Sequence, residues 1–245
     1  MIRVLVWNEN RHETRSEVVR AVYPEGIHGA IASFLGKEAD ITVKTATLDE
    51  ENAGITKELL AETDVLIWWG HIAHGEVPDE VAAMVRDAVL EGMGVIFLHS
   101  AHHSKPFRLL MGTSCNITWR ESGDSEILWV IEPGHPITRG IDRFFRLPAE
   151  ETYGEPFAIP TPDKVLLIGN YSGGEVFRSG VLYERSNGKV FYFQPGHETF
   201  PTYYDPAVCR VITNAVRYLA PTYRARIGNP HVRTVEDAEY VERMG

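Results

Sequence analysis

Ten histidines and only two cysteines occur among the 245 residues of this chain. Most of the histidines fall in short polar segments that directly follow a run of apolar residues: His71, His74, His99, His102, His103 and His197. Neutral imidazoles that gather with a carboxylate suit zinc or another divalent transition metal, and two cysteines are too few for a zinc-cysteine site. With an open coordination position, such a metal polarises a carbonyl or activates water. The pattern therefore favours metal-dependent catalysis.

The spacing of these histidines is by itself a weak signal. His71-x-x-His74 and His99-x-x-His102 can place two rings on one helical turn, but neither contains the glutamate of the His-Glu-x-x-His zinc motif. Their shared position after apolar runs is a stronger signal, because parallel sheets bind ligands just beyond the carboxyl ends of their strands. His71 and His99 are predicted as further ligands or as groups that contact the ligands. The predicted metal ligands themselves are His28, His102 and His197.

Several carboxylates lie near the same segments and could move a proton. The residues predicted to act in catalysis are Glu9, Glu155, Glu198 and His99. The segment 150–156 contains three carboxylates and is predicted to be a rigid loop, from which one carboxylate could complete a metal site or serve as acid or base. For Glu150 itself, a solvated position is expected.

Aromatic and polar side chains beside the same segments could hold a sugar. An aromatic ring has a flat apolar face that can stack on the apolar face of a sugar ring, although core packing is its commoner use. Core packing is expected for Trp68, Trp129 and Tyr192. The predicted substrate-binding residues are Trp69, His71, Ser100, Tyr153 and Tyr203.

An alternative hypothesis takes Ser100 as a nucleophile at the end of a strand. His197 would then be its base, with Glu198 or Glu9 orienting the histidine. The order of these residues is compatible with a triad, since triads occur in several sequence orders. The sequence around Ser100, however, lacks the Gly-x-Ser-x-Gly pattern of a strained nucleophile turn. A Ser100-His197 hydrolase is therefore the weaker alternative.

The elements that must position these residues predict an α/β fold. Five segments are predicted strands of a mostly parallel sheet: four apolar runs bounded by turn residues at 2–7, 64–69, 94–98 and 190–193, and an alternating segment at 41–46. Helices are predicted at 28–35, 56–62, 78–91, 107–111 and 205–219. Residues 113–185 are rich in proline and glycine and predict antiparallel additions and loops, with short strands at 127–131 and 165–168. Because right-handed crossovers keep parallel strands pointing one way, the histidine-bearing ends should meet at one edge.

Composition limits the class of protein and its partners. With 44% hydrophobic residues, the chain can bury the core of one domain, predicted for residues 1–220. A polar tail is predicted for 221–245, with a short helix begun by a capping box at 234–237. A formal charge of -10 argues against nucleic acid as a partner. No apolar run approaches the roughly 20 residues that span a bilayer, so a soluble, cytoplasmic protein without a membrane partner is expected, with self-association into a homo-oligomer left open.

The order of several short motifs resembles the trehalose-utilisation ThuA-like family from residue 2 to about residue 219. These motifs are Trp7-Asn8-Glu9 with His12-Glu13, Tyr23-Pro24-x-Gly26-x-His28, Trp68-Trp69-Gly70-His71-x-x-His74-Gly75, Leu98-His99-Ser100, Gly134-His135-Pro136-Ile137, Tyr153-Gly154-Glu155-Pro156-Phe157 and Pro195-Gly196-His197-Glu198-Thr199. The resemblance implies a class I glutamine amidotransferase-like fold. Such a fold is a three-layer α/β/α, flavodoxin-like arrangement with a mostly parallel sheet and antiparallel additions.

The resemblance also implies a function. Glutamine amidotransferases carry a catalytic cysteine at the strand-end turn and a later His-x-Glu, whereas Ser100 and the adjacent pair His197-Glu198 stand here, so glutaminase activity is not expected. The family implies a role in the catabolism of trehalose and related disaccharides, on 3-keto sugars made by a partner sugar dehydrogenase. The leading hypothesis is a metal-dependent enzyme, with a zinc-like ion, that acts on a 3-keto sugar or keto-glycoside by hydrolysis, elimination or isomerisation. The main alternative is a non-catalytic sugar-binding or regulatory protein.

Overall fold

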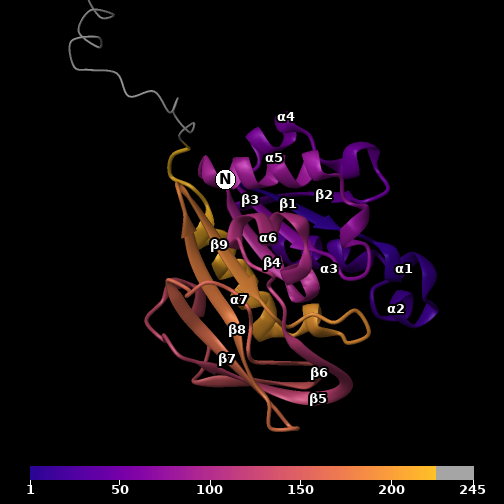
Figure 1. Cartoon of the computed structure of the whole chain (residues 1–245), viewed down its shortest axis with the longest axis vertical. Coiled ribbons are helices and arrows are strands. Elements are labelled where there is room, and N and C mark those ends of the chain that lie inside the picture. The colour runs from indigo at the N-terminus through magenta and orange to yellow at the C-terminus, as the bar shows by residue number, and fades with distance from the viewer. Residues whose placement is uncertain (225–245) are drawn as a thin grey trace, which may run out of the picture.

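The computed structural model describes residues 1–224, in which nine strands form one mixed sheet with helices packed against it (Figure 1). The strand order across the sheet is β2-β1-β3-β4-β9-β8-β7-β5-β6. The strands are β1 Ile2–Asn8, β2 Ile41–Thr47, β3 Val65–Trp69, β4 Gly94–Leu98, β5 Thr118–Val130, β6 Phe144–Gly154, β7 Lys164–Tyr171, β8 Val176–Arg185 and β9 Gly188–Phe193. The α/β class predicted from the sequence is confirmed.

The five predicted strands form the parallel half of the sheet. β1 pairs in parallel with β2 and β3, and β4 pairs in parallel with β3 and β9. The carboxyl ends of β1, β3, β4 and β9 therefore lie at one edge, as the sequence predicted. The segments that follow these four ends carry most of the histidines.

Antiparallel pairs build the rest of the sheet, in the lower part of Figure 1. The additions predicted within 113–185 are confirmed, but two of the four strands, β6 and β8, were not anticipated. The segment 150–156 is not the predicted rigid loop, because its first five residues complete β6. Its buried glutamates interrupt the apolar pattern that would have marked a strand.

Seven α-helices occur among residues 1–224: α1 Arg11–Arg15, α2 Glu17–Val22, α3 Gly26–Leu35, α4 Lys57–Glu62, α5 Asp79–Leu90, α6 Lys105–Met111 and α7 Pro206–Leu219. Successive residues of the central strands point to opposite faces of the sheet. Leu5 and Trp7 of β1 pack in one apolar cluster with residues of α4, α5 and α6. Val4 and Val6 pack in a second cluster with residues of α3 and α7. The longest helix, α7, has 14 residues, and no helix within residues 1–224 combines the length and hydropathy required to cross a membrane.

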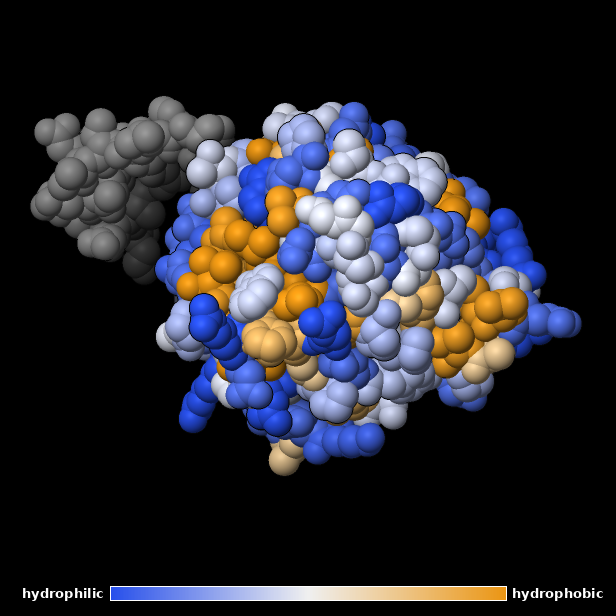
Figure 2. All heavy atoms as spheres, turned by 90° about the horizontal axis from the view of Figure 1, so that it is seen from below, coloured by the Kyte–Doolittle hydropathy of each residue, from blue (hydrophilic) through white to orange (hydrophobic). Residues whose placement is uncertain are grey.

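The surface of the described residues carries several large apolar side chains. On the face seen from below, apolar residues gather in two areas with polar residues between them (Figure 2). Such areas can serve as contacts between proteins. Self-association into a homo-oligomer stays a prediction. Light scattering of the purified protein would measure the number of subunits. The predicted helix at 234–237 lies outside the described residues.

Candidate metal centre at the strand ends

Three histidines and one glutamate converge at the carboxyl ends of the parallel strands. His71 follows β3, His99 follows β4, His197 follows β9, and Glu151 belongs to β6. One potential ligand atom from each residue lies within 4.8 Å of the corresponding atoms of the other three. The rings of the three histidines are 5.5 to 5.6 Å apart between centroids. They therefore form a nearly equilateral triangle beside a carboxylate.

Hydrogen bonds orient each imidazole through its Nδ1 atom. His71 Nδ1 lies 3.0 Å from Glu198 Oε2, and His99 Nδ1 lies 3.1 Å from the carbonyl oxygen of Gln194. His197 Nδ1 lies 2.8 Å from the hydroxyl of Thr199 and accepts a hydrogen bond of 3.4 Å from the amide of the same residue. Because the acceptors for His71 and His99 cannot donate, the proton of each neutral ring belongs on Nδ1, whereas Nδ1 of His197 is an acceptor. The Nε2 atoms of His71 and His99 therefore face away from these partners, an arrangement typical of metal-bound histidines.

The contact between His99 and Glu151 shows how the residues fit a metal ion. His99 Nε2 lies 3.0 Å from Glu151 Oε2, yet this buried oxygen has no partner with hydrogen-bond geometry among the described residues. Two ligands of a tetrahedral zinc ion, each roughly 2.0 Å from the metal, lie about 3.3 Å apart. The pair therefore has the separation of two atoms that share a cation, without the direction of an N–H···O bond.

The electrostatics of the cluster favour a protonated His99 beside an ionised Glu151. Burial opposes a charge on His99, but the adjacent Glu151 carboxylate outweighs it and raises the pKa of His99. Burial also opposes a charge on Glu151, whereas His99 holds the pKa of Glu151 below its usual value. Burial, aided by the nearby charge of His99, lowers the pKa of His197 to about 4. His197 is thus neutral near pH 7, the state that a metal ligand requires.

Glu198 is a buried carboxylate that contacts several imidazoles. Its Oε1 lies 3.3 Å from His12 Nδ1 and 3.7 Å from His197 Nε2, and its Oε2 is the acceptor for His71. Burial raises the pKa of Glu198, but the hydrogen bond from His71 and the nearby imidazoles outweigh burial and hold it at about 2. Glu198 therefore orients the histidines as a permanent anion. His12 joins His71 and Glu198 in a second group of potential ligands.

Glu150 fastens the turn that carries His197 to β6. It is fully buried, in contrast to the solvated position expected for it. Its Oε1 accepts hydrogen bonds from the backbone amides of Glu151 and His197, and its Oε2 accepts from the amide of Gly196 and the hydroxyl of Thr202. One carboxylate therefore sets the distance between Glu151 and His197.

The other two predicted acid-base residues are engaged elsewhere. Glu9 accepts hydrogen bonds from the amides of Ile72 and Ala73, at 2.9 and 3.0 Å, and so holds the loop that contains His71. Glu155 is paired with Arg178, whose Nε lies 2.7 Å from its Oε1. Neither glutamate belongs to the convergent group. In these positions Glu9 and Glu155 hold the backbone around the site and do not face the convergent group.

A cavity of about 340 Å³ opens beside the cluster. Its volume is typical of pockets for small molecules. Glu121 of β5 extends toward it, with its Oε1 3.9 Å from His197 Nε2. The lining residues are His71, His74, Ser100, His102, His103, Asn116, Ile117, Trp119, Glu121, Glu151 and Tyr153. Trp119 and Glu121 were not among the predicted site residues, because the strand that presents them was only partly recognised.

Two of the three predicted metal ligands lie outside the convergent group. His28, in the first turn of α3, faces Asn8, whose side-chain nitrogen is 3.1 Å from its Nδ1. His102 lines the cavity, but its Nδ1 lies 2.8 Å from the carbonyl oxygen of Cys115 and its ring packs against His103. Burial together with His103 lowers the pKa of His102 well below its ordinary value. Of the predicted ligand set, only His197 belongs to the cluster.

The predicted sugar-binding residues divide into two groups. Trp69 and Tyr203 are fully buried and cannot stack on a ligand. Trp69 Nε1 donates a hydrogen bond to the carbonyl of Gly196, so this residue supports the turn before His197. Ser100 and Tyr153, by contrast, line the cavity together with His71.

The turn after β4 places its strained residue one position before Ser100. His99 has a φ of 53°, in the left-handed region that is uncommon for residues other than glycine. The Ser100 hydroxyl lies 2.8 Å from the hydroxyl of Tyr153. Within residues 1–224 no hydrogen bond joins the Ser100 side chain to a histidine. The geometry therefore offers no support for the Ser100-His197 triad.

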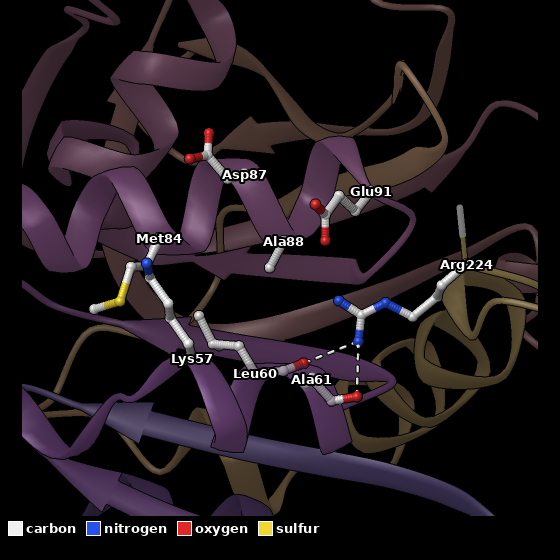
Figure 3. Close-up of a pocket in the computed structure, with 8 residues that line it drawn as sticks. All are labelled: Lys57, Leu60, Ala61, Met84, Asp87, Ala88, Glu91 and Arg224. Carbon is white, nitrogen blue, oxygen red and sulfur yellow. Dashed lines mark hydrogen bonds between the residues drawn. The ribbon is translucent and has the colours of Figure 1, made fainter. Parts of the chain in front are cut away.

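A larger cavity lies between α4 and α5, away from the strand ends (Figure 3). Its volume is about 570 Å³, and none of its lining residues is a histidine. Arg224 extends across it and donates hydrogen bonds to the carbonyls of Leu60 and Ala61 at the end of α4. These bonds satisfy carbonyl groups that a helix end leaves free. Cavity size alone would thus have pointed away from the cluster.

Glu126 of β5 is a buried carboxyl group outside the cluster, and replacing Glu126 by Gln is expected to stabilise the fold at high pH. Its Oε1 accepts a hydrogen bond from Ser179, whereas its Oε2 has no partner among the described residues. Burial, with a contribution from Glu150, raises the pKa of Glu126 well above 4.5. A raised pKa in the folded state leaves stability unchanged below about pH 4 and lowers it as pH rises toward the folded pKa.

Urea unfolding at several pH values measures this effect. Glu126→Gln should exceed the parent protein in free energy of unfolding by more than about 1 kcal/mol at pH 8, and the difference should vanish near pH 4. Glu132→Gln, on the partly exposed partner of Lys164, is the matched control and should show no such pH dependence. A difference that stays constant with pH would contradict the prediction.

The fold and the strand-end cluster together define an α/β protein with a histidine-rich candidate metal site. The family described as ThuA, trehalose utilisation, matches residues 3–219. The chain belongs to this family, as its motifs indicated. No curated protein matches the sequence.

Solved structures of similar fold include two proteins described as ThuA-like. The one from Bacteroides uniformis has a TM-score of 0.63 and 17% identity, over 89% of this chain and 91% of that one. The one from Parabacteroides merdae has a TM-score of 0.61 and 14% identity, over 94% and 93%. A protein from Salmonella typhimurium described as cytoplasmic has a TM-score of 0.61 and 14% identity, over 89% and 100%. At these identities the likeness concerns the fold.

Proposed function

We propose that this protein is a metal-dependent enzyme of trehalose or disaccharide catabolism that acts on a 3-keto sugar or keto-glycoside. The observation that carries the proposal is the convergence of His71, His99, His197 and Glu151 beside a cavity. Three imidazoles and one carboxylate suit zinc and other divalent transition metals. Membership of the trehalose-utilisation family supports the substrate class.

The residues around the cavity have distinct parts in this proposal. His71, His99, His197 and Glu151 would hold the ion, which when bound supplies a Lewis acid for a carbonyl and its neighbouring hydroxyl. Glu121 is the other carboxylate that lines the cavity. It would accept the proton from the carbon next to the carbonyl. The electron pair of that C–H bond would form the C=C bond of an enediol, and the π pair of the carbonyl would move onto its oxygen.

The same first step serves two of the three reactions considered. In an elimination, the electron pair returns from the oxygen, the bond to the glycosidic oxygen breaks, and the departing oxygen takes a proton. In an isomerisation, the proton returns to a different atom of the enediol. Hydrolysis would use a water molecule in place of the C–H bond. Each reaction requires Glu121 in its ionised form at the start.

The same proposal assigns the chain a flavodoxin-like, three-layer fold, and two features support it. The parallel strands follow the order β2-β1-β3-β4-β9, which corresponds to that of flavodoxin-like sheets. Apolar clusters cover both sheet faces, in keeping with a three-layer, amidotransferase-like fold. A cytoplasmic location and a sugar dehydrogenase that supplies the keto sugar complete the proposal.

Metal analysis and turnover of protein purified without a histidine tag test the function. We expect about one equivalent of a transition metal, retained or restored on reconstitution. NMR should show consumption of 3-keto-trehalose by the metal-loaded protein and none after chelation. Less than about a tenth of an equivalent, with none bound on reconstitution, would remove the metal. A loaded protein that binds the sugar but leaves it unchanged would indicate the non-catalytic alternative.

A further inference from the structure

Trp119 differs from the other tryptophans in its exposure. Trp7, Trp68 and Trp69 are almost completely buried, whereas Trp119 is 66% exposed. Among the described residues, no aromatic ring or cationic group packs against its indole. A large exposed apolar surface of this kind gains free energy when a ligand covers it. Its location decides which ligand that would be.

The register of the β5–β6 pair places Trp119 over the cavity. Trp119 lies directly opposite Tyr153, and directly opposed residues of antiparallel strands extend from the same face of the sheet. Tyr153 in turn stacks on His99, with ring centroids 5.1 Å apart. Glu121, two residues after Trp119, shares this face because side chains alternate along a strand. One strand therefore presents an indole and a carboxylate above the candidate metal centre.

Burial decreases from the cluster toward Trp119. His99 and His197 are 0% and 1% exposed, whereas Glu121 and Trp119 are exposed. A ligand whose carbonyl reaches the cluster would therefore extend outward past Glu121 to the indole. The polar groups along this route accept or donate hydrogen bonds, which suits hydroxyl groups. The indole offers an apolar face, which suits the C–H face of a sugar ring.

We propose that Trp119 is the binding platform for the second ring of a two-ring glycoside whose first ring occupies the cluster. This inference rests on the proposed function and narrows its substrate class from keto sugars to disaccharides and similar glycosides. The side-chain oxygens of Glu121 and Asn116, which line the same cavity, accept hydrogen bonds from hydroxyl groups of the sugar. A monosaccharide reaches the cluster without covering Trp119.

Calorimetric titration with trehalose and with glucose tests the platform without requiring turnover. We expect Trp119→Ala to lose about tenfold in affinity for trehalose, the effect of one aromatic stacking contact. Its affinity for glucose should change less than about twofold, and Trp119→Phe should bind trehalose with intermediate affinity. Trp129→Phe, a change on the same strand away from the cavity, is the matched control and should bind both sugars as the parent does.

Tryptophan fluorescence supplies a second measurement on the same proteins. Trehalose should shift the emission of the parent and of Trp129→Phe, and the shift should be absent in Trp119→Phe. Equal trehalose affinities for the parent and Trp119→Ala, or a parent that binds neither sugar, would overturn the platform. If the protein binds no metal on reconstitution but Trp119→Ala still weakens trehalose binding, the proposed metal-dependent catalysis is refuted and the platform stands. Because Trp119 is exposed, circular dichroism should show unchanged folding in all variants.

Discussion

The double variant His99→Asn with Glu151→Gln is expected to lose its metal and at least about a hundredfold in turnover. In the proposed metal centre the two side chains would supply adjacent ligands from opposite halves of the sheet, one after β4 and one in β6. An amide oxygen or nitrogen is a poorer ligand for a transition metal than a carboxylate or an imidazole. The remaining two histidines cannot close a stable coordination shell. Metal content by mass spectrometry and keto-sugar turnover by NMR are the measurements.

A matched control changes the same residue types at buried positions away from the cavity. His135→Asn with Glu126→Gln removes one buried histidine and one buried glutamate, and it should retain both metal and turnover. The asparagine oxygen can replace His135 Nδ1, which accepts the amide of Ile137 at 3.2 Å. If the His99 and Glu151 variant is folded and keeps its metal, the convergent group is not the metal centre.

Replacing Glu150 by Ala is expected to lower the free energy of unfolding by about 3 to 5 kcal/mol. The change leaves the buried amides of Glu151, Gly196 and His197 without an acceptor, since all three donate to this carboxylate. The cost of each unsatisfied donor is about 1 to 3 kcal/mol, and the cavity left by the side chain adds to it. The same change should weaken metal binding, because His197 and Glu151 would lose their common anchor.

Urea unfolding and metal titration check the two consequences of this substitution. Glu132→Ala, which breaks a partly exposed pair with Lys164, is the control and should change stability little, as surface ion pairs usually do. A Glu150→Ala protein as stable as this control would show that water satisfies the freed amides. In that case the carboxylate is not the fastener of the turn.

Much of the parallel half of the sheet could be predicted, because its signals are local. The continuous apolar runs before His71, His99 and His197 each form a buried strand, and their polar exits lie at one edge. The chirality of βα connections brings these exits together without any knowledge of side-chain contacts. The family match over residues 3–219 confirms the resemblance that the motifs indicated.

The antiparallel half was less accessible to prediction because long-range pairing decides it. Glu151 becomes a potential ligand only because β6 pairs with β5, after β5 has joined the sheet through β7 and β8. A glutamate such as its neighbour Glu150 is normally expected at the surface. Here the amides of the turn around His197 donate hydrogen bonds to the Glu150 carboxylate and offset the cost of burying it. Such burial cannot be read from a local pattern of apolar residues.

The sequence by itself determined that histidines would gather at the ends of parallel strands, because residue type, apolar runs and chain chirality are local properties. Only the tertiary structure decided which of them converge. His99, whose own backbone is left-handed, lies in the cluster. His102 lies against the carbonyl of Cys115, and His28 lies beside Asn8. These differences arise from backbone angles and from partners distant in sequence. The choice of Glu151 as the fourth member has the same cause, since a contact between strands, rather than spacing along the chain, brings it to the site.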